Sequence, residues 1–158
     1  MEPAAYIRRE TRVSIAINAA LSAAFFAALF GFDGPVPVWG AGGFVADFAP
    51  QGFMVGLMAT VVPGLLARRA RATGRLAGLS GSAPSPAPIA LRAVLCGVIG
   101  AGAGVAMAAL ALGAGGQAAL AWFPALVAKI GFGAILAGLA TPAGLRAELM
   151  ARRTGEGS

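Results

Sequence analysis

Four long apolar stretches run through the chain, and short segments rich in glycine, proline or arginine separate them. Each stretch has about 20 residues or more, which as an α-helix is enough to cross a hydrocarbon core of about 30 Å. The pattern predicts membrane spans over residues 13–32, 44–67, 89–112 and 118–143. We therefore expect residues 1–158 to form a single domain, an all-α integral membrane protein with four transmembrane helices.

The connections between the spans predict how the helices are paired. Asp33, Gly34 and Pro35 stop the first span, and a turn over Gly113–Gly116 follows the third, because glycine and proline commonly mark turns. Residues 68–88 form a longer linker, rich in arginine, proline and serine, a composition that favours an extended or flexible chain. Two short connections and one long linker predict two antiparallel hairpins.

Basic residues predict the orientation of these hairpins. Of the 12 Lys and Arg residues, all except Lys129 fall in three clusters, over residues 8–12, 68–92 and 146–153. The connections after the first and third spans contain none, and cationic loops stay on the cytoplasmic side during insertion. We expect both termini and the linker to be cytoplasmic. Trp39 and Trp122 then fall at the outer boundary, where indole side chains are enriched.

The remaining composition suggests a bacterial inner membrane. Arginine is used almost exclusively over lysine, and alanine and glycine are abundant, as in proteins from GC-rich bacterial genomes. The first apolar run, residues 13–32, is longer than the 7–15 residues of a signal-peptide core. We interpret it as a retained anchor, with signal-peptide cleavage after one of its small residues as the alternative.

The two halves of the sequence resemble each other. Each second helix has an early proline, Pro50 or Pro124, and carries a Gly-Leu, Ala-Thr, Pro, Gly-Leu series, over residues 56–65 and 138–145. Two hairpins with the same orientation would form a parallel repeat, related by an axis along the membrane normal. Chance similarity in a chain rich in alanine and glycine is the alternative.

Charge and composition exclude several classes of function. The net charge of +6 does not predict nucleic-acid binding, because it is divided among positions that flank the spans. Its expected partner is the anionic cytoplasmic leaflet, at about 1 kcal/mol per basic residue. The chain has no histidine and one cysteine, Cys96, so it cannot form an internal disulfide. We find no catalytic, phosphate-binding or metal-ligating motif, and we expect no enzyme, cofactor or metal.

Small residues mark the helix faces expected to pack closely. Bilayers remove the hydrophobic drive between helices, so contact faces are enriched in residues that let backbones approach. Such residues recur at helical spacing in the second and third spans: Gly52, Gly56, Gly97, Gly100 and Gly104. These faces either pack the four helices against one another or, in the third span above all, form a homo-oligomer interface.

Lys129 is the polar residue predicted to lie deepest. It is 11 residues into the span 118–143, or about 16 Å below the outer boundary, close to the bilayer centre. There Lys129 could pair with a polar partner, or it could take part directly in transport or binding. Alternatively, its side chain could extend to the headgroups or carry an uncharged amine. The candidate partners, Asp47 and Gln51, share one face of the second span, and their depths make contact with Gln51 easier.

A polar stripe follows one face of the first span. Thr11, Ser14, Asn18 and Ser22 recur at steps of three and four residues, which places them on the same side of a helix. Asn18 is the candidate for a hydrogen bond to another helix, a contact that contributes about 0.6 kcal/mol on average. The alternative is that the stripe lines a cytoplasmic vestibule.

Two functions are consistent with this pattern. The first is a non-enzymatic accessory or assembly subunit, which acts through helix–helix packing with a membrane partner or further copies of itself. The second is a small oligomeric transporter or channel that uses Lys129 with Gln51 and Asp47. The proline-interrupted second and fourth helices favour the second function, since kinks free backbone groups that can line a cavity.

Overall fold

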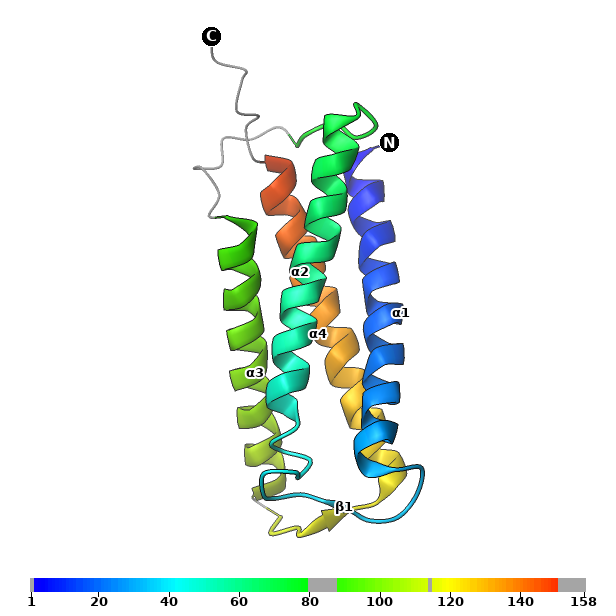
Figure 1. Cartoon of the computed structure of the whole chain (residues 1–158), viewed down its shortest axis with the longest axis vertical. Coiled ribbons are helices and arrows are strands. Elements are labelled where there is room, and N and C mark those ends of the chain that lie inside the picture. The colour runs from blue at the N-terminus through cyan, green and yellow to red at the C-terminus, as the bar shows by residue number, and fades with distance from the viewer. Residues whose placement is uncertain (1, 80–87, 114, 151–158) are drawn as a thin grey trace.

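The computed structural model describes residues 2–79, 88–113 and 115–150, and these form four long helices and one two-stranded ribbon (Figure 1). The helices are α1 (Pro3–Phe30), α2 (Phe48–Ala72), α3 (Ile89–Gly113) and α4 (Trp122–Met150). All four are long and apolar enough to cross a membrane. The prediction of an all-helical protein with four such helices is confirmed.

Prolines account for where the helices begin. Pro3 opens α1, Pro88 directly precedes α3, and Pro50 and Pro124 are the third residues of α2 and α4. Proline is tolerated in a first turn because the N–H groups there have no partner within the helix. Deeper inside a helix it removes a hydrogen bond. For this reason α2 and α4 begin four residues later than the predicted spans 44–67 and 118–143.

Three helices also extend beyond the predicted spans, at the end of the bundle that carries the arginines. α1 begins ten residues before residue 13, α2 continues five residues past Ala67, and α4 continues seven residues past Ala143. Hydropathy detects only the apolar part of a helix, whereas the backbone hydrogen bonds continue into its polar end. Of the arginines expected in the linker 68–88, Arg68, Arg69 and Arg71 therefore belong to α2.

The two helices within each half of the sequence pack weakly against each other. α2 packs mainly against α3 and α4, and α1 packs mainly against α4, whereas α1 with α2 and α3 with α4 touch little. Figure 1 shows α1 and α3 on opposite sides of the central pair α2 and α4. The bundle is therefore held together by contacts between the two halves of the sequence.

A short ribbon joins the two halves at one end of the bundle. β1 (Val36–Pro37) pairs antiparallel with β2 (Ala119–Leu120). The Trp39 indole donates a hydrogen bond to the Gln117 carbonyl at 3.0 Å, and Trp122 donates one to the Gly31 carbonyl at 3.0 Å. We call this the tryptophan end; it lies at the bottom of Figure 1.

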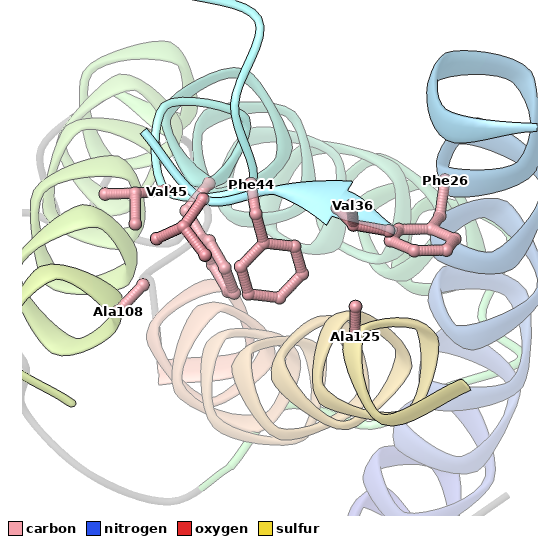
Figure 2. Packing of buried hydrophobic residues seen from close by; sticks show 8 residues of the cluster. Phe26, Val36, Phe44, Val45, Ala108 and Ala125 are labelled. Carbon is pink, nitrogen blue, oxygen red and sulfur yellow. The ribbon is translucent and has the colours of Figure 1, made fainter. Parts of the chain in front are cut away.

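The largest apolar cluster lies beside this ribbon. Figure 2 shows Phe26 of α1 next to Val36 of β1, with Phe44 of the following segment over α4 and Val45 on the side of α3, towards Ala108. These side chains insert between helices that would otherwise separate, and Phe26 packs edge-on against Trp122 with ring centroids 5.7 Å apart. The connection after α1 thus forms part of the core.

Glycines bring the backbones of α2 and α3 into contact. A Cβ atom on Gly52 would overlap the Gly100 carbonyl, and one on Gly56 would overlap the Cys96 carbonyl. Gly97 faces Phe53 of α2, and Gly104 faces Phe132 of α4, with their Cβ positions 2.9 and 2.7 Å from those side chains. The predicted packing face of the third span is therefore occupied within one chain.

A buried carboxylate holds the other end of the bundle together. Glu148 of α4 is 3% exposed and accepts hydrogen bonds from Arg68 of α2, at 2.6 and 3.2 Å. Arg92 of α3 contacts the same carboxylate, and Arg71 donates to the Glu148 carbonyl at 2.8 Å. We call this the arginine end. It links α2, α3 and α4. Arg152 and Arg153, from the third predicted basic cluster, lie outside the described residues.

Glu148→Gln is expected to destabilise the bundle by about 1.5–3 kcal/mol, the range for hydrogen bonds to charged groups. The change removes the negative charge that lies between Arg68 and Arg92. Unfolding of the purified protein in mild detergent measures the effect. Glu10→Gln is the control, because Glu10 is 4.0 Å from a largely exposed Arg9, and it should cost less than about 0.5 kcal/mol. Equal effects would contradict this role for Glu148.

Candidate functional site

The strongest polar site within the helices is an ion pair between α2 and α4. The ammonium Nζ of Lys129 lies 2.7 Å from a carboxylate oxygen of Asp47, the residue that directly precedes α2. Lys129 is 1% exposed, whereas the Asp47 side chain is 17% exposed. The cation is thus enclosed by protein, and only the carboxylate reaches the surface.

Two aromatic rings complete the surroundings of this ammonium. Its Nζ lies 3.7 Å from the centroid of the Phe48 ring and 5.0 Å from that of Phe44. The negative face of an aromatic ring attracts a cation, with a contribution of about 0.5–2 kcal/mol. Lys129 is therefore held by one carboxylate and two π-faces. The sequence pattern gave no sign of the two rings, which belong to the core beside the ribbon.

Gln51 lies one helical turn after Asp47 and contacts Lys129 through the backbone. Its Nε2 donates to the Lys129 carbonyl at 3.0 Å and to the hydroxyl oxygen of Ser22 in α1 at 2.8 Å. A carbonyl oxygen can only accept, so the amide must present its nitrogen there. Gln51 joins α1, α2 and α4. Its Oε1 is buried and accepts no hydrogen bond from the described residues.

The structure thus brings both candidate partners, Asp47 and Gln51, to Lys129, but its amine contacts Asp47 and not Gln51. The depths of the predicted spans made contact with Gln51 easier. Both α2 and α4 begin four residues later than predicted, so the relative depths of Asp47 and Lys129 along their helices are those expected. The long side chain of Lys129 extends towards the start of α2 and meets Asp47 there.

The polar stripe of α1 faces α4. The Thr141 hydroxyl lies 2.8 Å from the Ser14 hydroxyl and donates to the Ala59 carbonyl of α2 at 3.1 Å. Asn18 is also buried, but its amide donates within α1, to the Ser14 carbonyl at 2.8 Å. Ser14 and Ser22 therefore make the contacts between helices, and Asn18 does not make the hydrogen bond that we expected across helices.

Two ion pairs tie α2 to α4, one at each end of the bundle. The Asp47–Lys129 tie lies at the tryptophan end, and the Arg68–Glu148 tie at the arginine end. The ties are 21 residues apart along α2 and 19 along α4, or about 31 and 28 Å. A hydrocarbon core is about 30 Å thick. The Arg68–Glu148 ion pair was not predicted from the sequence, because Glu148 lies beyond the predicted span 118–143.

The polar groups of the site are bonded mainly to one another and to the backbone. Among the described residues, no three or more of His, Cys, Asp or Glu lie close enough together to hold a metal ion. The carboxylate of Asp47 is held by Lys129, and the nearest polar neighbours are hydroxyls and amides bonded to each other or to the backbone. The ion pair joins α2 to α4 and leaves the Asp47 carboxylate partly exposed.

No protein-family model, curated protein or solved structure matches the chain. The site must therefore be interpreted from its own chemistry. Its polar groups join helices α1, α2 and α4, and the single cation at its centre is enclosed and paired.

Proposed function

We propose that the protein is a non-enzymatic accessory or assembly subunit of a bacterial inner membrane, and that it acts through helix–helix packing. The observation that carries this proposal is the state of Lys129. An intramembrane cation that served a transport path would face a cavity. Here it is 1% exposed, paired with Asp47, and joins α2 to α4.

The other polar side chains near the helix contacts support the same function. Ser14, Asn18, Ser22, Thr60 and Thr141 are buried within the bundle. The outward surfaces of all four helices instead carry large apolar side chains, and α3 above all. A surface of this kind contacts lipid, or a membrane-protein partner that presents a complementary face.

The partner is a second membrane protein or a further copy of this chain. The glycine face of α3 is occupied by α2 and α4, so association would use the outward faces of the helices. Arginines at one end of the bundle are also suited to the anionic cytoplasmic leaflet, to which each basic residue contributes about 1 kcal/mol. We propose no nucleic-acid partner.

A transporter or channel is the second candidate, and one observation favours it. A cleft of about 560 Å³ between α1 and α2 is lined by Asp47, Gln51 and Asn18, among mainly apolar residues. Lys129, however, is enclosed and does not line this cleft. A transport pathway would also require an oligomer, because four helices rarely enclose a pore.

Purification in mild detergent from native membranes, followed by flux assays in reconstituted vesicles, separates the two candidates. A subunit should copurify with a membrane protein in a fixed ratio and give vesicles no more permeable than protein-free ones. Flux that Lys129→Met abolishes while the helical content stays unchanged would favour the transporter. Absence of any partner in several detergents would contradict the accessory function.

We also propose that both termini are cytoplasmic. The arginine end gathers the start of α1, the ends of α2 and α4 and the start of α3 (Figure 1), while the tryptophan end carries Trp39 and Trp122. This separation supports the positive-inside orientation. A periplasmic signal from a reporter fused after Ser158 would contradict it.

The proposed repeat of two parallel hairpins is supported by the contact pattern. If the two halves of the sequence are exchanged, the helix pair α1–α4 takes the place of the pair α3–α2, and both of these pairs pack closely. It also converts β1 into β2, which pair with each other. The similar segments 56–65 and 138–145 meet where α2 crosses α4, since the Cβ position of Gly144 lies 3.4 Å from Thr60.

A further inference from the structure

The cleft between α1 and α2 has the properties of a ligand pocket. α1 leans on α4, so it separates from α2, and an apolar cluster that includes Tyr6, Ile7 and Ala67 closes the gap near the arginine end. Towards the tryptophan end the gap stays open and encloses about 560 Å³. Small-molecule pockets typically enclose about 300–1,000 Å³ and are mostly apolar, with few polar groups.

Long apolar side chains form the two walls of this cleft. Phe25 and Leu29 on α1 are 66% and 61% exposed, and Met54 and Met58 on α2 are 53% and 45% exposed. Methionine adapts its shape to the group that it contacts. Such walls suit a hydrocarbon chain that enters sideways from the bilayer.

The length of the cleft fits one leaflet. Along α2 it runs from Asp47 to Met58, a rise of about 16 Å over eleven residues. One leaflet contributes about 15 Å to a hydrocarbon core of 30 Å. A single amphiphile can therefore fill the cleft, whereas a complete transmembrane helix would extend well beyond it.

The polar end of the cleft determines which head group fits. Asp47 lies in the cleft at its tryptophan end, where the head group of a bound amphiphile would lie, and its carboxylate is partly exposed. A carboxylate can only accept hydrogen bonds, so the head group must donate. Lys129 already balances the charge of Asp47. A charged head group would add an uncompensated charge in an apolar setting, which is costly.

We propose that this cleft binds one lipid alcohol, an uncharged amphiphile whose hydroxyl donates a hydrogen bond to Asp47. Its hydrocarbon chain lies between Phe25 and Leu29 on one side and Met54 and Met58 on the other. The site goes beyond the proposed function and does not depend on it. A subunit without a transport activity can hold such a lipid. If the search for protein partners fails, the labelling experiment below still tests the lipid site.

Photolabelling tests this site directly. The full chain is reconstituted in phosphatidylcholine nanodiscs, because this headgroup has no N–H or O–H donor, and labelled with tetradecanol that carries a photoactivatable diazirine in mid-chain. We expect adducts on α1 and α2 within the cleft. Unlabelled tetradecanol should compete at least about tenfold better than its methyl ether, the factor that one charge-assisted hydrogen bond provides. Tetradecylamine and myristate should also compete more weakly than the alcohol.

A matched pair of variants controls for unspecific lipid contact. Met54→Trp fills the cleft without touching the ion pair, and it should remove most of the labelling. Ile99→Trp adds the same bulk on the outward face of α3, where Ile99 is 67% exposed, and should leave the labelling unchanged. Equal competition by the ether, adducts spread evenly over α3, or the same labelling in both variants would overturn the proposal.

Discussion

Asp47→Asn is expected to destabilise the protein by about 3–5 kcal/mol, the cost of removing one partner from a buried ion pair. The change leaves the ammonium of Lys129, which is 1% exposed, without a carboxylate. Lys129→Met should cost less, because the carboxylate left behind is 17% exposed and can still be solvated. Unfolding midpoints in mixed detergent micelles measure both effects.

The double variant Asp47→Asn/Lys129→Met isolates the interaction. Two neutral side chains leave no buried charge, so the double variant should be more stable than Asp47→Asn alone, and the non-additivity gives the coupling energy of the pair. Additive effects would show that Asp47 and Lys129 stabilise the bundle independently. A larger loss for Lys129→Met than for Asp47→Asn would contradict the burial that we describe.

Gly100→Leu should separate α2 from α3 and cost at least about 3 kcal/mol, the upper part of the range for overpacking. A Cβ atom at this position would lie 2.6 Å from the Gly52 carbonyl oxygen and 2.8 Å from a methyl group of Leu136. The Gly52 carbonyl belongs to a helix backbone and cannot rotate away. Loss of the folded bundle in size-exclusion chromatography and a lowered unfolding midpoint are the expected results.

Gly102 is the matched control, two residues further along the same helix. Apart from its chain neighbours and the nearby backbone of α3, no atom of the described residues lies within 4 Å of its Cβ position. Gly102→Leu should leave stability within about 0.5 kcal/mol, or raise it by up to about 1 kcal/mol because leucine favours helix over glycine. Similar losses for both variants would mean that the effect comes from the glycine backbone and not from the α2–α3 contact.

The sequence predicted the helices well because membrane spans have a strong compositional signal. The beginning of α3 at Ile89 coincided with the predicted residue, since Pro88 and hydropathy indicate the same boundary. Elsewhere hydropathy was misleading, because residues 44–46 and 118–121 are apolar but precede a proline that fixes the start of a helix. They pack in the connections instead.

The partners of the helices and of the polar residues could be predicted only in part. A periodic stripe shows which face of a helix is polar, but not which helix it meets, and α1 packs against α4 rather than against α2. Lys129 was placed on the correct helix, but residue depth alone did not show that its long side chain extends towards the start of α2 and pairs with Asp47. Glu148 followed the apolar run and was therefore overlooked.

The distance between the two ion pairs that join α2 to α4 gives the bundle a preferred bilayer thickness. Both ties keep charged groups at the ends of α2 and α4, about 30 Å apart. A thicker membrane would draw one of them into hydrocarbon, and a thinner one would uncover apolar side chains, each at a fraction of a kcal/mol per ångström of mismatch. Because the ties also hold the helices side by side, tilting one helix cannot relieve this mismatch. The protein should therefore sort by bilayer thickness.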